Sequence, residues 1–161
     1  MTEDDRNEPA RAPIFDIVAW EQKQQEHDRR FDELLLANKT ALFDVLASTG
    51  IEIVDVNFDG YGDSGQIESI EAKGGDNVIE LPTTQIEIVT PVWDSPEIHR
   101  QTMTAHDAIE HLVYELLRKT HDGWEDNDGA YGDFTFDVAD RTITLDYNER
   151  YIETDYSHHS F

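Results

Sequence analysis

Two glycine-rich turns, each beside residues that alternate between apolar and polar, most constrain the fold of this chain. The first lies in FDGYGDSGQIE (58–68) and the second in NDGAYGDFTFD (127–137). Alternation with a period of two puts every second side chain on one face of a strand. Asp-Gly pairs commonly reverse the chain between antiparallel strands. These stretches therefore predict an antiparallel sheet with one buried face and one face in water.

Helical periodicity appears in two other parts of the chain. Residues 14–49 carry apolar residues around the wholly polar stretch EQKQQEHDRR, and Gly50 is a typical residue for a helix end. A second helix follows Thr104, which is an N-cap candidate with Asp107 three residues later. We expect residues 14–161 to form one α+β domain with a helical extension at 14–37. Residues 1–13 are expected to be a disordered acidic tail.

The expected order is a helix, three strands, a helix and three strands, with mainly antiparallel pairing. The first strand, IEIVDVNF (51–58), shows a slip in its alternation near Val54 that suggests a bulge. Residues 78–90 are expected to form a strand interrupted by a proline, and residues 93–101 a loop. The chain is then expected to end as a three-stranded meander at 134–138, 143–147 and 151–156.

Charge restricts the partners of this chain. Its 161 residues include 36 acidic and 12 basic ones, a formal net charge of −24. Such a chain repels nucleic acid and anionic lipid and attracts basic surfaces, so we expect no direct nucleic-acid or membrane binding. There is no cysteine, which excludes disulfides and thiolate metal sites. Without a signal peptide or an apolar span, a cytoplasmic protein is expected. Adaptation to salt is an alternative source of the acidity.

Acidic side chains are expected on the outer face of the sheet. If Phe134 and Phe136 face the core, Asp133 and Asp137 face water. Alternate residues on a strand lie about 6.6–6.8 Å apart, which is close to the separation of successive phosphates in an extended nucleic-acid strand. The sequence thus allows a carboxylate array that imitates a phosphate backbone, or a merely solvated acidic face. The candidate interaction surface is Asp59, Asp63, Asp126, Asp128, Asp133, Asp137, Asp146, Glu153 and Asp155.

The two acidic turns also allow a cation site, although their spacing excludes EF-hand loops, whose ligand positions here fall on Gly60, Gly62 and Trp124. A different cation site would need the two turns to meet in space. Ordinary turn chemistry is the explanation that we favour for the Asp-Gly pairs. Our interpretation is that both Tyr-Gly-Asp stretches present carboxylates at one end of the sheet while Tyr61 and Tyr131 pack.

A metal-dependent nuclease or phosphodiesterase is the enzymatic alternative. Glu71-Ala-Lys73 has the spacing of an E-x-K motif, and Asp59 or Asp63 lies on the preceding hairpin. That motif is short, and the residues around it are not basic enough to hold a DNA backbone. A zinc helix is excluded, because two histidines five residues apart lie about 140° apart around a helix. We expect no catalytic residue, no metal and no cofactor.

The segments FDGYGDSGQIE, GWEDNDGAYGDFTFDV and ITLDYNERY resemble a family of small acidic bacterial proteins without an assigned activity. The resemblance covers residues 38–161 and leaves the first 37 residues outside. It implies an origin in phages, plasmids or chromosomal islands, and it implies no chemistry. We therefore expect a non-catalytic acidic protein that occupies the basic surface of a nucleic-acid-binding protein, as a DNA-mimicking inhibitor from a mobile element.

Overall fold

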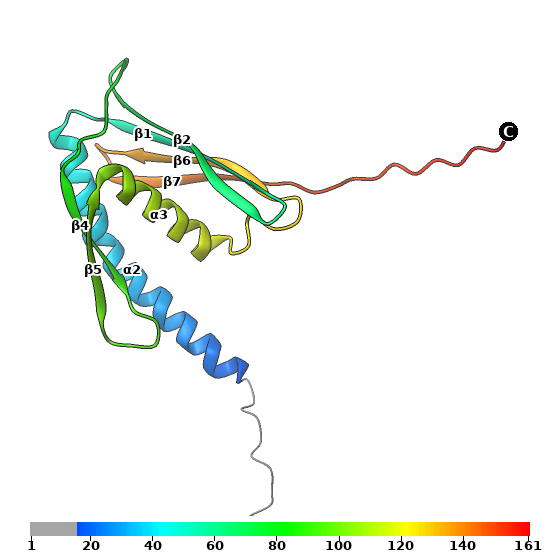
Figure 1. Cartoon of the computed structure of the whole chain (residues 1–161), viewed down its shortest axis with the longest axis horizontal. Coiled ribbons are helices and arrows are strands. Elements are labelled where there is room, and N and C mark those ends of the chain that lie inside the picture. The colour runs from blue at the N-terminus through cyan, green and yellow to red at the C-terminus, as the bar shows by residue number, and fades with distance from the viewer. Residues whose placement is uncertain (1–15) are drawn as a thin grey trace, which may run out of the picture.

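The computed structural model describes residues 16–161, so the expected tail at 1–13 lies outside the described residues. The fold is α+β, as predicted, and its elements are shown in Figure 1. In chain order they are α2 (Ile17–Ser48), β1 (Ile53–Tyr61), β2 (Ser64–Gly74), β3 (Asn77–Val78), β4 (Gln85–Pro91), β5 (Ile98–Thr104), α3 (Ala105–Thr120), β6 (Ala130–Asp137) and β7 (Thr142–Glu149).

The strands form two antiparallel sheets. The larger one has five strands in the order β3-β2-β1-β6-β7, and β4 pairs only with β5 in the smaller one. In Figure 1, α3 runs along one face of the larger sheet, and α2 extends from one end of that sheet beside β4 and β5. None of the described helices has both the length and the apolar composition needed to cross a membrane.

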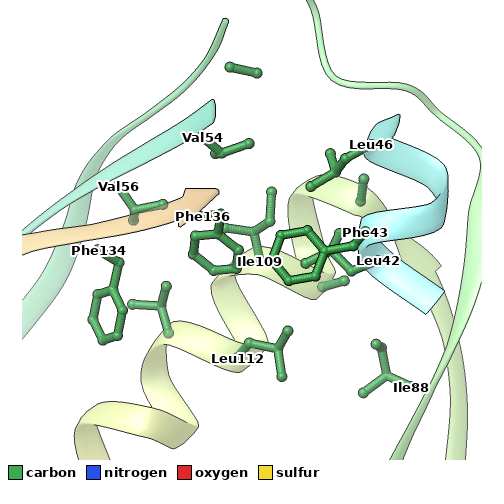
Figure 2. Packing of buried hydrophobic residues seen from close by; sticks show 14 of the residues in the cluster. Leu42, Phe43, Leu46, Val54, Val56, Ile88, Ile109, Leu112, Phe134 and Phe136 are labelled. Carbon is green, nitrogen blue, oxygen red and sulfur yellow. The ribbon is translucent and has the colours of Figure 1, made fainter. Parts of the chain in front are cut away.

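The core lies between the larger sheet, α3 and the last turns of α2. Figure 2 shows Val54, Val56, Phe134 and Phe136 of the sheet facing Ile109 and Leu112 of α3, with Leu42, Phe43 and Leu46 closing one end. The strands β1 and β6 bury every second residue, because only one of their faces meets the helices. No described element covers the opposite face of the five-stranded sheet, which we call the open face.

One buried polar side chain joins α2 to the smaller sheet. Asn38 is 1% exposed, the only polar or charged residue buried among residues 16–161. Its Nδ2 donates to the Val89 carbonyl at 2.9 Å, and its Oδ1 accepts from the Val89 backbone N–H at 2.9 Å. Because both backbone groups of Val89 are satisfied by one amide, α2 replaces the strand that β4 lacks on that side.

The expected slip near Val54 is wrong. Val54, Val56 and Phe58 are all buried on the same face, and Ile53 points to the other face. Ile51 is also buried, but it precedes the strand in the connection from α2, so its burial does not follow the period of two. The irregularity lies instead at Asn57 and Phe58, where β2 contributes one extra residue.

Two other expectations for strands are corrected. Residues 98–104 form β5, which begins within the expected loop at 93–101. This strand has mostly exposed side chains, so it lacks the alternation that marks a half-buried strand. The expected strand at 78–90 is divided between β3 and β4, which belong to different sheets, with Pro82 in the connection.

The third strand of the expected C-terminal meander, at 151–156, is absent. Residues 150–161 carry no secondary structure and leave the domain beyond β7. The observed order is therefore a helix, five strands, a helix and two strands.

Candidate interaction surface

The two Tyr-Gly-Asp stretches meet at one end of the five-stranded sheet. The Gly62 backbone N–H donates to the Asn127 carbonyl at 3.2 Å, and the Asp63 N–H donates to the Glu125 carbonyl at 3.0 Å. Strand pairing places Gly60 opposite Ala130. The β1–β2 turn and the loop before β6 are therefore in direct contact.

Close packing against Trp124 explains the glycines in the first turn. The buried indole lies over the β1–β2 hairpin and meets the Phe58 ring edge-on, with centroids 5.4 Å apart. A Cβ on Gly60 would lie 2.6 Å from this indole, and one on Gly65 would lie 2.4 Å from it. Neither distance is compatible with a side chain, so both positions need glycine.

The second motif also needs its glycines for close approach. Gly129 has a φ of +76°, and a Cβ there would lie 1.7 Å from the Gly60 carbonyl oxygen. At Gly132 a Cβ would lie 2.0 Å from the backbone oxygen of Asp146 on β7. The repeated Gly pattern therefore serves the packing of one turn against the other and of β6 against β7.

The expectation that Tyr61 and Tyr131 pack is wrong. Tyr61 is 69% exposed and Tyr131 is 45% exposed. Tyr131 lies opposite Asp59 in the β1–β6 pairing, so its side chain belongs to the open face rather than to the core. The Arg150 guanidinium lies over the Tyr131 ring, 4.6 Å from its centroid, in a cation–π contact.

Carboxylates gather where the turns meet. Burial, a hydrogen bond with Asp63 and the negative charge of Glu125 together raise the pKa of Asp126 above its usual value. Even so, the turns do not form a metal site of the expected kind. Within residues 16–161, one group of three side chains has ligand atoms near enough to share an ion, and it is His106, Asp107 and Glu110 on α3.

We expect Asp126→Asn to stabilise the domain slightly at pH 7 and to reduce its response to acid. A raised folded-state pKa favours folding at low pH, and this contribution is lost as the pH rises through that pKa. Thermal unfolding between about pH 4 and 7 should therefore show a smaller gain on acidification in the variant than in the wild type. The matched control is Glu80→Gln at an exposed position, and an equal change in both variants would contradict this role of Asp126.

The open face carries carboxylates on all four of its long strands. Strand pairing puts Asp133 of β6 between Asn57 of β1 and Asp146 of β7. Asn57 donates to the Asp133 carboxylate and accepts from the Ser69 hydroxyl at 2.6 Å, so a polar row crosses three strands. Six acidic residues lie at paired strand positions of this face, namely Asp55, Asp59, Glu71, Asp133, Asp137 and Asp146.

Two cations partly neutralise this face. The Lys73 ammonium lies 3.2 Å from Glu71 and 3.8 Å from Asp55. The Arg150 guanidinium donates to Asp59 at 2.8 Å and to the Gly60 carbonyl at 3.3 Å. These ion pairs lie near opposite ends of β1, and the middle of the face around Asp133 and Asp146 has no cation from the described chain within ion-pair distance.

The nine candidate residues from the sequence occupy three places. Four of them lie on the open face: Asp59, Asp133, Asp137 and Asp146. Three lie at the turns, namely Asp63, Asp126 and Asp128, and two lie on the exposed C-terminal segment, namely Glu153 and Asp155. Asp55 and Glu71 belong to the face and were missing from the candidate surface. The alternation of Val54 and Val56, read without a slip, places Asp55 there.

The four residues of the nuclease alternative do not come together. Glu71 is opposite Asp55, whereas Asp59 is opposite Gln66, four residues further along β1. Four residues of strand span roughly 13 Å, and Asp63 lies further still in the turn. Lys73 lies beside Glu71 and Asp55, whereas Asp59 and Asp63 lie too far from Glu71 to share a metal ion with it. The four residues of the nuclease alternative therefore do not provide two carboxylates and a lysine around one metal ion.

A hollow of about 650 Å³ lies between the first half of α2 and the β4–β5 connection. Arg30 of α2 donates to the carbonyls of Val92, Ser95 and Glu97, and Lys23 lies 3.1 Å from Asp94. These contacts hold the connection to the helix. The residues around this hollow offer ion pairs and no nucleophile paired with a base.

The fold defines an α+β domain in which helices pack on one face of the main sheet. The other face of this sheet is acidic and open. Residues 34–161 match the model of a family of unknown function, DUF6878, and the chain belongs to this family. The match confirms the resemblance to an uncharacterised family and begins within α2. Comparison with curated proteins and with solved structures gave no match.

Proposed function

We propose that the open face binds a basic surface of a nucleic-acid-binding protein, in the place that DNA would occupy, and that it does so without catalysis. The observation that carries this proposal is the set of six carboxylates on the strands of that face, with Lys73 as the one cation on them. A surface of this kind attracts a groove lined by lysine and arginine and steers it into contact.

The distribution of charge favours a partner over uniform salt adaptation. Of the cations in the described part of the chain, seven lie on α2, β5 and α3, where they alternate with acids: Lys23, Arg29, Arg30, Lys39, Arg100, Arg118 and Lys119. The open face of the sheet has two, Lys73 and Arg150. Adaptation to salt would require acids over the whole surface and gives no reason for a contrast between the two sides of the molecule.

A pair of like charges at the centre of the face supports the same proposal. Asp133 and Asp146 lie directly opposite each other on β6 and β7. Like charges in such a position destabilise a sheet. A binding partner that supplies cations would remove this repulsion, whereas a face that is only solvated gains nothing from it.

The spacing of the array also fits a phosphate-like surface. Neighbouring strands lie about 4.7–4.9 Å apart, and alternate residues lie about 6.6–6.8 Å apart along a strand. Arginine and lysine side chains that reach successive phosphates could therefore reach carboxylates on this face. An inhibitor encoded by a phage or plasmid, acting on a defence system or a DNA-processing enzyme, is the role that we propose for such a surface.

The double charge reversal Asp55→Lys with Asp146→Lys tests the proposal. Both residues lie on the open face, and neither side chain accepts a hydrogen bond from the described backbone, so the fold should persist. Proteins captured from a lysate by the wild type should be released by added duplex DNA. The variant should bind those same proteins at least about tenfold more weakly at low salt.

The matched control reverses two acids on the helices, Glu21→Lys with Glu110→Lys, and makes the same change in net charge. Binding that depends on the open face should survive this control. If both double variants lose binding equally, total charge and not the face attracts the partner. Capture that is indifferent to salt, to DNA and to both variants would contradict the proposal.

A further inference from the structure

Asp59 of the open face has a tyrosine on each of two sides. Strand pairing puts Tyr131 of β6 opposite Asp59, and Tyr61 is the next residue of β1 whose side chain lies on the same face. Alternate residues of a strand lie about 6.6–6.8 Å apart. These three residues lie at the end of the face where the two turns meet, and we call them the Tyr-Asp-Tyr cluster.

Arg150 shows which kind of side chain this cluster accepts. Its guanidinium lies 4.6 Å from the centroid of the Tyr131 ring. It also donates to Oδ1 of Asp59 at 2.8 Å and to the Gly60 carbonyl at 3.3 Å. A planar guanidinium can stack on a ring and donate to a carboxylate at the same time, whereas an ammonium is a compact charge without a flat face. The cluster therefore has the geometry of an arginine site.

The second tyrosine of the cluster has no such contact. Tyr61 is 69% exposed, and no cation of residues 16–161 lies over its ring. Arg150 uses Oδ1 of Asp59, and no other side chain in the described part of the chain donates to that carboxylate. Asp63 follows two residues later in the β1–β2 turn and adds negative charge at the same end of the sheet. An open ring beside these acids offers a place for one more guanidinium.

We propose that Tyr61 binds an arginine side chain of the basic partner, with the guanidinium stacked on the ring and Asp59 as its hydrogen-bond acceptor, and that this contact selects arginine over lysine. The contact of Arg150 with Tyr131 is an example of the same chemistry within this protein. The inference rests on the proposed function, because it names the side chain that one end of the open face takes from its partner.

The other end of the open face lacks the means for such a selection. Asp55 is paired with Glu71 and Thr135, and none of these three residues has an aromatic neighbour at the adjacent positions of this face. The Lys73 ammonium lies beside Glu71 and Asp55 without a contact to a ring. The face as a whole therefore attracts positive charge, and the Tyr-Asp-Tyr cluster adds a preference for the planar guanidinium.

Oligo-arginine and oligo-lysine peptides of equal length test the preference, because they carry the same charge. Fluorescence anisotropy of labelled peptides at low salt measures the two dissociation constants. We expect oligo-arginine to bind the wild type more tightly, and Tyr61→Leu to reduce this preference by about two- to fivefold, the size of one exposed cation–π contact. The matched control is Tyr156→Leu, which removes a ring that is 85% exposed outside the open face and should leave the preference unchanged.

Removal of the Arg150 guanidinium tests the same chemistry at the other tyrosine. Arg150→Gln frees the Tyr131 ring and Asp59, so we expect tighter binding of oligo-arginine and a larger preference over oligo-lysine. Lys73→Gln is the matched control, because it makes the same change in charge on the same face and uncovers no ring. It should strengthen the binding of both peptides alike. An equal change of the preference in the two variants would overturn the arginine site.

The outcomes separate this inference from the proposed function. If neither peptide binds the wild type, or if Asp55→Lys with Asp146→Lys leaves peptide binding unchanged, the open face does not bind basic partners and both proposals fail. If the peptides bind through this face with equal affinity, or if the preference for arginine survives in Tyr61→Leu, the proposed function stands and the role of Tyr61 is overturned. A preference that falls in Tyr61→Leu and rises in Arg150→Gln supports the inference.

Discussion

Trp124→Ala is expected to lower the free energy of unfolding by about 3–5 kcal/mol, which is the usual cost of removing a buried aromatic ring. The indole fills the space above Gly60 and Gly65 and contacts Phe58, so its loss leaves a void that two glycines cannot fill. The β1–β2 turn would also lose the surface that holds it to the loop before β6. Chemical unfolding monitored by far-UV circular dichroism measures the effect.

Trp93→Ala is the matched control. Trp93 lies in the β4–β5 connection, is partly exposed, and contacts the His27 ring at a centroid distance of 5.4 Å. Because its removal creates little buried void, we expect a change of less than about 1 kcal/mol. Equal losses in the two variants would mean that the contact between the turns does not contribute specially to stability.

Asn38→Leu is expected to destabilise the domain by about 2–6 kcal/mol, although leucine has a similar size. The substitution leaves the N–H and the C=O of Val89 buried without partners. Each unsatisfied group costs about 1–3 kcal/mol. The smaller sheet should loosen from α2 first, which hydrogen exchange at β4 would detect as faster exchange than at β6.

Asn38→Asp separates this hydrogen-bond role from the shape of the side chain. An ionised carboxylate accepts from the Val89 N–H but cannot donate to its carbonyl, whereas a protonated carboxyl group can do both. Burial would raise the pKa of this aspartic acid, so the lost stability should return as the pH falls through that pKa. Asn38→Leu should show no such recovery, and an identical pH response in both variants would contradict the role assigned to the amide.

The local pattern of the sequence was sufficient for the elements that bury one face. The periodicity after Thr104 predicts α3, and the alternation around Phe134 and Phe136 predicts both β6 and its outward aspartates. The local sequence pattern failed to predict segments whose buried residues do not recur with a regular period. The strand β5 is exposed over most of its length, and Ile51 is buried by its place after α2 rather than by strand alternation.

The candidate surface likewise contains features that follow from the local sequence pattern and features that do not. Outward positions such as Asp137 and Asp146 follow from alternation, which needs only the period of a strand. Which carboxylates share a face depends on strand order, and β6 lies beside β1 although some 70 residues separate them in the chain. The pairing of Asp59 with Arg150, and the distance between Asp59 and Glu71, could not be read from neighbouring residues.

By itself, the sequence determined the α+β class, the acidic character and the outward direction of the acids on β6 and β7, because these depend on composition and local period. The tertiary structure alone decided three things: that the two glycine turns meet beneath Trp124, that the acids form one open face, and that residues 151–161 form no strand beyond β7. Each of these depends on contacts between segments that lie far apart in the chain. Close packing around the Trp124 indole, the strand order of the sheet and the contacts of Arg150 select one arrangement. The local sequence patterns would allow several arrangements equally.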